Sequence, residues 1–230
     1  MAYEQKFFIP SEVVDPSGHL RLSELLMLAQ KMATAHIEAL GYPIASTRGR
    51  NLFWVVARQR FLIDAIPSFP DEILFRTHPG EGRAFVYPRH YEILSNGKTI
   101  IRGVSAWVLI DGISRKIVTP KEANVILPGE DQEGDLPFPS GIRAPELPQV
   151  AKKKADWSLC DINGHLNNTK YLDLCEDLIP EDFLMSHQAK EIVCEYKKEI
   201  HLGEEFEVHY GKIGDSYWFA SDRFLFRIDY

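Results

Sequence analysis

A six-residue pattern occurs twice in this 230-residue chain and constrains its fold more than any other feature. Asp15-Pro16-Ser17-Gly18-His19-Leu20 returns 146 positions later as Asp161-Ile162-Asn163-Gly164-His165-Leu166. Each copy stands ahead of a helical pattern, and each helical pattern is followed by alternating segments rich in aromatic and β-branched residues. Self-similarity at a fixed spacing is the signature of a repeated structural unit. The sequence therefore predicts two copies of one structural unit, each consisting of a helix and a sheet.

The first helical pattern is a stripe of apolar residues spaced three and four positions apart. These residues are Leu22, Leu25, Leu26, Ala29, Met32, Ala33, Ile37 and Leu40. Ser23 is the expected N-cap, and Gly41 followed by Pro43 supplies a stop signal. The second stripe comprises Tyr171, Leu172, Cys175, Leu178 and Ile179, with Pro180 as its end. Each stripe is wide enough to be buried against a sheet.

Alternation with a period of two residues predicts antiparallel strands after each helix. The candidate strands span residues 3–9, 52–64, 72–78, 84–95 and 98–111 in the first half, and 151–157, 192–200, 205–213, 217–220 and 224–230 in the second. Between two of these segments, the pair Asn96-Gly97 predicts a tight hairpin, because both residues tolerate the positive φ angles that such a turn requires.

Residues 119–149 separate the two units and contain six prolines together with Gly129, Gly134 and Gly141. This composition predicts a linker with little helix or strand. The expected organisation is a first unit at 1–118, a linker at 119–149 and a second unit at 150–230. Each unit is a long helix wrapped by an antiparallel sheet, so the predicted fold class is α+β, with the two units packed as a pseudo-dimer.

The composition is that of a soluble globular chain, with 45% hydrophobic and 26% charged residues. No segment approaches the roughly 18 consecutive apolar residues of a membrane-spanning helix. An excess of 33 acidic over 26 basic residues gives a net charge of −7, which argues against nucleic-acid binding. Cys160, Cys175 and Cys194 form no CxxC pair, so neither a zinc site nor a disulfide framework is expected. A reduced, cytoplasmic protein is predicted.

An Asp-x-Asn-x-His-x-Asn-Asn motif at the start of the second helix resembles the hotdog fold. The doubled unit resembles the acyl-acyl-carrier-protein (acyl-ACP) thioesterases of plants and bacteria, over nearly the whole chain. The segments that carry the resemblance are Asp161–Tyr171, Leu52–Arg58, Glu195–Glu199, and Ile101–Val108 followed by Arg115. Four landmarks in family order are more specific than a single motif match.

This resemblance implies a tandem double hotdog in which the second unit carries the chemistry and the first helps to house the acyl chain. It also implies that Asp161, Asn163, His165 and Glu199 are the catalytic polar residues. Plant members commonly have a cysteine directly after the matching glutamate, whereas this chain has Ile200. A thiol nucleophile is therefore not expected. The resemblance favours hydrolysis of fatty acyl-ACP by water, without a cofactor, in the step that terminates fatty acid synthesis.

Thioester hydrolysis requires an activated nucleophile and stabilisation of the developing oxyanion, whereas the thiol leaves easily. We predict that Glu199 is the general base that activates water, with Asp161 orienting His165 or Asn163. Asn163, His165 and a backbone amide at the helix start, with Asn167 as N-cap, are expected to polarise the carbonyl. His165 as the base in place of Glu199 is the competing assignment.

Each of these residues also has a purely structural interpretation. Asp161 and Asn163 are typical of an Asx-turn, and His165 is equally compatible with a hydrogen-bonded loop histidine. The strand parity of Glu199 on its own predicts a carboxylate that faces solvent. The first copy has Ser17 in place of Asn163 and lacks the paired asparagines, so we interpret it as a structural relic.

The resemblance implies acyl-carrier protein, a small acidic protein, as the partner. Because like charges across an interface are costly, an acidic enzyme needs a local basic surface to bind it. The lysines that flank the motif in sequence are the predicted carrier-binding residues: Lys152, Lys153, Lys154, Lys197 and Lys198. No metal is expected, because the eight histidines do not pair with cysteines or acids at ligand spacing. Oligomeric state is not defined by the sequence, and a homodimer is compatible with it.

Three alternative functions belong to neighbouring classes. A hotdog dehydratase is disfavoured because the His-Phe-Pro run of such enzymes is absent. A coenzyme A thioesterase differs from the favoured function only in the carrier of the acyl group. A non-catalytic acyl-binding module is expected to lose the polar residues of the motif, and this chain retains them. The length and saturation of the acyl chain are not readable from the sequence.

Overall fold

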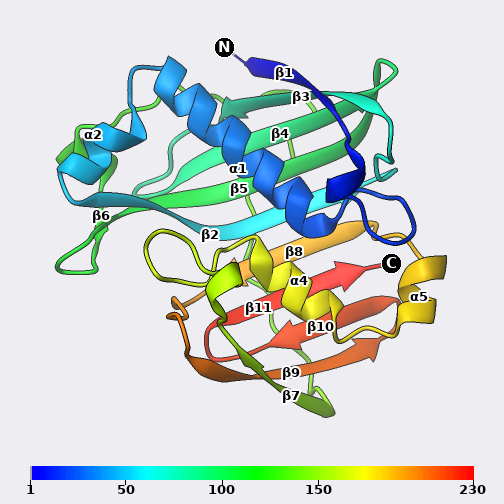
Figure 1. The fold of residues 1–230 in the computed structure, drawn as a ribbon. Coiled ribbons are helices and arrows are strands. Elements are labelled where there is room, and N and C mark those ends of the chain that lie inside the picture. The colour runs from blue at the N-terminus through cyan, green and yellow to red at the C-terminus, as the bar shows by residue number, and fades with distance from the viewer. Residues whose placement is uncertain (1) are drawn as a thin grey trace.

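Two helix-on-sheet units, one above the other, make up the computed structural model, which describes residues 2–230 (Figure 1). The helices are α1 (Leu22–Ala39), α2 (Ile44–Gly49), α3 (Pro120–Ala123), α4 (Lys170–Glu176) and α5 (Glu181–Ser186), with 3-10 turns at Ser11–Val13 and Trp157–Leu159. The strands are β1 (Tyr3–Phe8), β2 (Leu52–Ile63), β3 (Glu72–Pro79), β4 (Tyr87–Ser95), β5 (Lys98–Asp111), β6 (Ile117–Val118), β7 (Gln149–Lys154), β8 (Glu191–Tyr196), β9 (Glu205–Ile213), β10 (Ser216–Ala220) and β11 (Phe224–Asp229). Helix α1 lies across the upper sheet and α4 across the lower one, which confirms the predicted double hotdog.

The two half-sheets form one continuous antiparallel sheet. Its strand order is β1-β3-β4-β5-β2-β8-β11-β10-β9-β7, with β6 paired to β5. Strands β2 and β8 join the units, so that Gln59 faces Cys194 and Arg60 faces Val193. An ion pair of 2.5 Å between Arg60 and Glu191 reinforces this seam. Because the strand pairing is shared, the units have one fixed orientation, and the end of β8 lies against the first unit.

The core forms between the helices and the concave side of the sheet. From α1 it takes Leu25, Leu26, Ala29 and Met32, from the first half-sheet Phe61, Phe75, Tyr91 and Ile93, and from α4 Tyr171, Leu172 and Cys175, all of them buried. Full burial of one large apolar side chain contributes about 1.5–3 kcal/mol. Packing on this scale exceeds what a single helix cap contributes, about 1 kcal/mol, so the apolar stripes decide where the helices lie.

The ends of both helices differ from the predictions. Helix α1 begins at Leu22 after Arg21, and the predicted cap Ser23 is wholly buried inside it, because the buried stripe already starts at Leu22. The second helix was predicted to continue to Ile179, but α4 ends at Glu176. A further short helix, α5, begins directly after Pro180.

Three predicted strands lose residues at one end in the structure, and one of them, predicted at 151–157, is β7, which ends at Lys154. Residues 84–86 form a tight turn instead of the start of β4: Ala84 has a φ of 52° and the Val86 amide donates to the Arg83 carbonyl. Strand β8 ends at Tyr196, because the amides of Lys197 and Lys198 both donate to the carbonyl of Arg223. The prediction that residues 197–200 belong to the strand was therefore wrong, and strand parity does not apply to Glu199.

Other local predictions are confirmed. Ser95 pairs with Lys98 across the hairpin, and Asn96 and Gly97 have φ angles of 51° and 76°. The segment 119–149 contains α3, which begins with a capping box formed by Thr119 and Glu122. The rest of that segment has no helix and joins β7 at Gln149. Within residues 2–230, no helix combines the length and the apolar character that crossing a membrane demands.

Candidate active site

The loop before α4 is organised by the carboxylate of Asp161. Its Oδ1 accepts the backbone N–H groups of Asn163 at 2.8 Å and His165 at 3.4 Å, and its Oδ2 accepts the Asn163 side-chain amide at 3.2 Å. The Asp161 N–H donates in turn to the carbonyl of His165. The Asx-turn interpretation is thus realised, and Asp161 also orients Asn163 directly. It contacts His165 through the backbone and not through the imidazole.

The structure brings Glu199 to His165. Residues His165 and His201 form an isolated β-bridge, and the Leu166 N–H donates to the Ile200 carbonyl at 2.8 Å. This short ladder places Oε1 of Glu199 3.5 Å from Nδ1 of His165. Both side chains are partly accessible, with 32% of Glu199 and 19% of His165 exposed, so a substrate and a water molecule can reach them.

Two arginines from the first unit complete the cluster. Arg115, in the turn between β5 and β6, forms an ion pair with Oε2 of Glu199. Arg48, in α2, donates to Oδ1 of Asn163 at 3.1 Å. In Figure 1, α2 and the β5–β6 turn lie on the same side of the molecule as the loop before α4. We call Asp161, Asn163, His165, Glu199, Arg48 and Arg115 the polar cluster.

Sequence reasoning did not assign roles to these two arginines. Arg115 was visible only as a family landmark, and Arg48 only as one of four arginines within thirteen positions. Arg115 lies in a tight turn, in which its own backbone has a φ of 57°. Neither contact is encoded by local spacing, because each joins residues of different units.

The surroundings of His165 favour its neutral imidazole. Partial burial lowers the pKa of His165, the nearby His201 ring and the Arg115 guanidinium lower it further, and Asp161 opposes them by raising it. The two histidine rings pack edge to face, with centroids 4.6 Å apart. A neutral imidazole at pH 7 can donate one hydrogen bond and accept another.

Two backbone amides at the start of α4 have partners within the preceding loop. The N-cap of α4 is Thr169, whereas Asn167 had been predicted. The Asn167 side chain accepts the Thr169 N–H at 3.0 Å, and the Asn167 carbonyl accepts the Lys170 N–H at 2.8 Å, which closes a turn before the helix begins. These two amides are thus engaged within the loop, whereas the side chains of the polar cluster include donors suited to a substrate carbonyl.

The first copy of the repeat keeps the turn but not the cluster. Asp15 accepts the Ser17 amide and hydroxyl, and Ser17 lies 2.7 Å from Nδ1 of His19. The Leu20 N–H donates to the Pro67 carbonyl, as Leu166 does to Ile200. The position equivalent to Glu199 is therefore Ile66, which carries no carboxylate. This supports the interpretation of the first copy as a relic.

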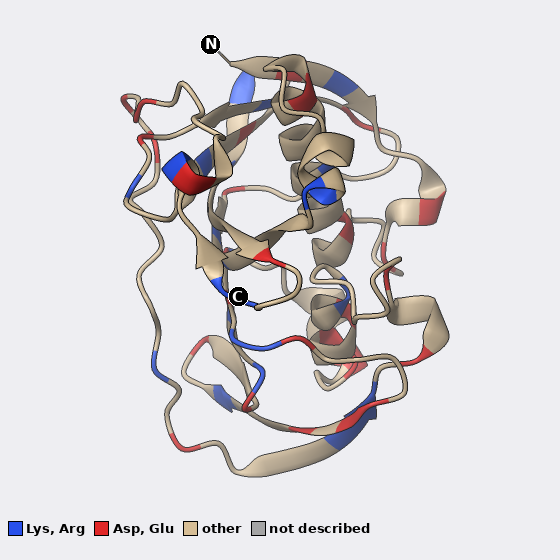
Figure 2. Cartoon of the chain, turned by 90° about the vertical axis from the view of Figure 1, so that its left-hand side faces the viewer, with Lys and Arg blue, Asp and Glu red and all other residues tan. Residues whose placement is uncertain are grey.

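The predicted carrier-binding lysines do not form one patch. Lys197 and Lys198 are exposed beyond the end of β8, and Lys152 and Lys154 are exposed on β7. Lys153 points the other way, 3.7 Å from Asp177, with 18% of its side chain exposed. At the lower edge of the molecule, where β7 pairs with β9, basic and acidic segments lie next to one another (Figure 2), and Lys152 and Lys154 stand opposite Glu207 and Glu205. A strand alternates its side chains between two faces, so three consecutive lysines cannot share one face.

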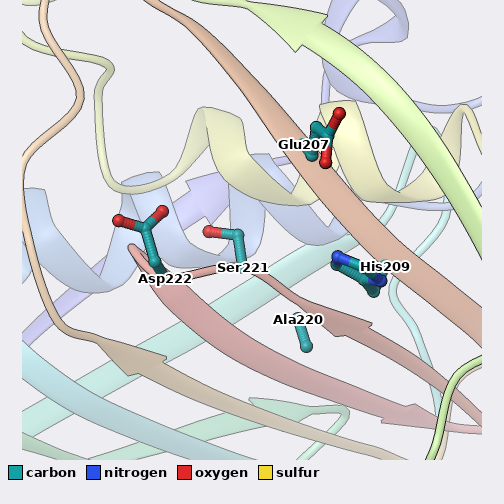
Figure 3. A pocket seen from close by; sticks show the side chains of 5 residues that line it. All are labelled: Glu207, His209, Ala220, Ser221 and Asp222. Atoms are coloured by element: carbon teal, nitrogen blue, oxygen red, sulfur yellow. The ribbon is translucent and has the colours of Figure 1, made fainter.

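A surface hollow of about 490 Å³ lies on the second unit, and none of the residues of the polar cluster lines it. It is lined by Glu207, His209, Ala220, Ser221 and Asp222 (Figure 3). Lys152 is the register partner of Glu207, and Lys198 lies 3.9 Å from Asp222. Ala220 is the one apolar residue among those that line the hollow, so this hollow lacks the apolar side chains that an acyl chain needs. Within residues 2–230, the group able to hold a metal ion is His78, His90 and Asp135, on the first unit.

Comparison with known proteins identifies the family. Residues 1–124 match the family model of the acyl-ACP thioesterase N-terminal domain, and residues 146–222 match that of the C-terminal domain. Oleoyl-acyl carrier protein thioesterase 2 of Arabidopsis thaliana is 27% identical over 223 residues, with 86% of this chain and 59% of the relative covered. The palmitoyl-acyl carrier protein thioesterase of the same plant is 24% identical over 217 residues, covering 86% and 52%. The chain thus spans little more than half the length of these curated relatives.

Solved structures share the fold over the whole chain. An acyl-ACP thioesterase from Bacteroides thetaiotaomicron superposes with a TM-score of 0.86 at 20% identity, covering 99% of this chain and 97% of the other. The 12:0-ACP thioesterase of Umbellularia californica gives a TM-score of 0.83 at 18% identity, covering 99% and 96%. Together with the two matched family models, this arrangement shows that the chain belongs to the acyl-ACP thioesterase family.

Proposed function

We propose that this protein hydrolyses the thioester of fatty acyl-ACP to a free fatty acid and holo-ACP, and so terminates fatty acid synthesis. The observation that carries the proposal is the contact of Glu199 with both His165 and Arg115, beside the turn that holds Asn163. These residues lie at the junction of both units of a chain whose relatives are named for this substrate class.

In the proposed mechanism, Glu199 is the general base. Arg115 binds Oε2, which leaves Oε1 directed toward His165 and available to a water molecule. Glu199 takes one proton from this water as its oxygen attacks the thioester carbonyl carbon. The tetrahedral intermediate then collapses, the C–S bond breaks, and the thiolate leaves and takes up the proton. A carboxylate that is fixed in place but partly solvated suits this role.

His165 and Asn163 are the proposed donors to the carbonyl oxygen. The lowered pKa of His165, caused first by burial, keeps its ring neutral, so that it donates without adding a charge. Hydrogen bonds to Asp161 and Arg48 hold the Asn163 side chain in one conformation. Its amide therefore loses little conformational entropy when it binds the substrate carbonyl. Preorganised donors of this kind contribute about 3–4 kcal/mol to acyl-transfer catalysis.

The cysteines are poor candidates for a covalent nucleophile. Ile200 follows Glu199 directly, where plant relatives commonly have a cysteine. Burial raises the pKa of the Cys175 and Cys194 thiols, and burial together with Asp161 raises that of Cys160. The thiolate is the reactive form, so a raised pKa disfavours attack by sulfur. This supports direct attack by water.

Carrier binding is proposed for the exposed members of the lysine set. Lys197 and Lys198 lie one to two positions before Glu199, so a carrier bound to them would stand close to the polar cluster. Lys152 and Lys154 are secondary candidates because acidic residues of β9 lie opposite both. Lys153 is the weakest member, since Asp177 already neutralises it. A cytoplasmic location and a homodimer remain predictions.

The test is a set of acyl-ACP thioesters of graded chain length, with release of free thiol as the measurement. Coenzyme A thioesters of the same acyl groups form the second arm, and Glu199→Gln protein is the blank. We expect thiol release from acyl-ACP at a kcat/KM well above that for acyl-CoA. Equal or greater kcat/KM for acyl-CoA would overturn the carrier assignment, and no release from either would overturn the hydrolase.

A further inference from the structure

Two histidines of the first unit face each other across neighbouring strands. His78 of β3 and His90 of β4 are register partners, and their rings stack with centroids 5.1 Å apart. Both are shielded from solvent, with 12% of the His78 side chain and 4% of the His90 side chain exposed. Neither belongs to the polar cluster, and the proposed reaction uses neither.

Two aspartates of the segment 119–149 meet these rings. Oδ2 of Asp135 lies 2.9 Å from Nε2 of His78 and 3.6 Å from Nε2 of His90. Oδ1 of Asp131 lies 3.3 Å from the same His90 nitrogen. Asp131 also binds Arg83 and the amide of Glu81, so its carboxylate is held in place. The result is a set of two imidazole nitrogens and two carboxylate oxygens from three separate segments.

The spacing of these atoms matches that of ligands around one small cation. Nε2 of His78, Nε2 of His90 and an oxygen of Asp135 all lie within 4.8 Å of one another. Tetrahedral zinc holds its ligands at about 2.0–2.2 Å, which separates neighbouring ligand atoms by roughly 3.4 Å. The three contacts between imidazole nitrogens and carboxylate oxygens, at 2.9, 3.3 and 3.6 Å, lie close to that value.

Gly80 keeps this position open. A Cβ atom at residue 80 would lie 2.6 Å from Nε2 of His90 and 2.7 Å from Oδ1 of Asp131. Any side chain there would collide with both of these atoms. The glycine thus leaves room beside the atoms that a cation would contact.

We propose that His78, His90 and Asp135, with Asp131 beside His90, form a binding site for a divalent transition-metal ion of the zinc class. Two imidazoles select zinc, cobalt or nickel over magnesium and calcium, which prefer all-oxygen sites. The ion joins the segment 119–149 to the outer side of the first half-sheet. We assign the ion a structural role, because it joins segments that are far apart in the sequence.

The site was not visible in the sequence. His78 and His90 stand twelve positions apart on separate strands, and Asp135 follows forty-five positions later. Only the cross-strand register and the return of the segment 119–149 over the sheet bring them together. The proposal is independent of the thioesterase activity.

The experiment is a metal titration of the full chain after removal of bound metal with a chelator. Zinc affinity is measured by calorimetry, and the coordination geometry by the visible absorption of bound cobalt. We expect one equivalent to bind, the intense absorption of tetrahedral cobalt, and a zinc-dependent rise in Tm. Loss of one ligand in His78→Ala or Asp135→Asn should weaken binding by more than about 100-fold, since loss of an outer-shell partner alone costs 10- to 100-fold.

The matched control is His209→Ala, which removes an exposed histidine of the second unit and should leave zinc affinity unchanged. Melting curves without metal verify that each variant is folded, and the wild-type titration is decisive without any variant. Absence of zinc binding by the wild-type chain would overturn the proposal. Equal affinities in His78→Ala, Asp135→Asn and wild type would do the same, because the ion would then bind elsewhere.

Discussion

The Nδ1 atom of His165 lies 3.5 Å from Oε1 of Glu199, although the two residues are 34 positions apart. The bridge between His165 and His201 holds the two backbone segments side by side, so that the side chains of His165 and Glu199 meet. Arg115 then reaches the other oxygen of Glu199 from the first unit. The carboxylate of Glu199 therefore links Arg115 of the first unit to His165 in the loop before α4.

Replacement of Glu199 by glutamine should lower kcat by about 100- to 10,000-fold, which is the usual contribution of a general base. The substitution keeps the shape of the side chain and removes the proton acceptor. Steady-state kinetics on acyl-ACP provide the measurement, and Glu205→Gln, which alters an exposed carboxylate on β9, is the control. A near-normal kcat in Glu199→Gln, combined with an inactive His165→Ala, would assign the base to His165.

Loss of Arg115 should act on the reaction through Glu199 and His165. We expect Arg115→Ala to lower kcat by about 10- to 100-fold with a smaller change in KM. Arg115→Lys should keep part of the lost kcat, since lysine retains the charge but not the planar guanidinium group. The guanidinium lowers the pKa of His165, so its removal raises that pKa. The acid limb of the pH–rate profile should therefore move to higher pH.

The exposed Arg102 on β5 provides the matched control for Arg115, because its replacement by alanine changes the net charge by the same amount. A similar fall in kcat for Arg102→Ala would show that overall charge, and not the contact with Glu199, is responsible. If the acid limb of the pH–rate profile does not move in Arg115→Ala, Arg115 does not set the pKa of His165 in the reaction.

Reversal of charge at Lys197 and Lys198 should weaken carrier binding. We expect the double substitution to glutamate to raise KM for acyl-ACP by about tenfold at low salt, with the difference shrinking as salt screens the charges. KM for an acyl-pantetheine thioester, which lacks the carrier protein, should stay constant. Lys31→Glu, on the exposed side of α1, is the control. Unchanged KM values and salt dependence would place carrier binding elsewhere.

Glu176 should make the fold less stable at high pH. Burial raises the pKa of this α4 carboxyl to about 8, with Asp173 and Asp15 adding to the effect. Its folded pKa exceeds its unfolded value, so its contribution is fully present below about pH 4.5. That contribution is lost progressively as the pH rises through about 8.

Glu176→Gln removes this ionisation. At pH 9 the variant should be more stable than wild type by on the order of 2 kcal/mol. This difference is smaller than the raised pKa of Glu176 alone would give, because the side chain is partly exposed. At pH 5 the two proteins should unfold alike. Denaturant unfolding at both pH values is the measurement, with the exposed Glu181→Gln as control. A stability difference that is the same at pH 5 and pH 9 would contradict the prediction.

Local patterns in the sequence were sufficient to predict the architecture. The repeated Asp-x-x-Gly-His-Leu segment revealed two units, the apolar stripe placed α1, and the Asn96-Gly97 pair specified the hairpin between β4 and β5. These features depend on contacts between near neighbours in the chain, or on burial of one face against any apolar surface. Such properties are written in the residue order itself.

The sequence also named the polar residues of the loop before α4, since an Asx-turn is built from adjacent residues. Four partnerships were decided by the tertiary structure: Glu199 with His165, Arg115 with Glu199, Arg48 with Asn163, and the two histidines of β3 and β4 with Asp131 and Asp135. Each depends on strand register and on how the units dock. Register is set by the burial of whole faces of the sheet, so no local pattern contains it.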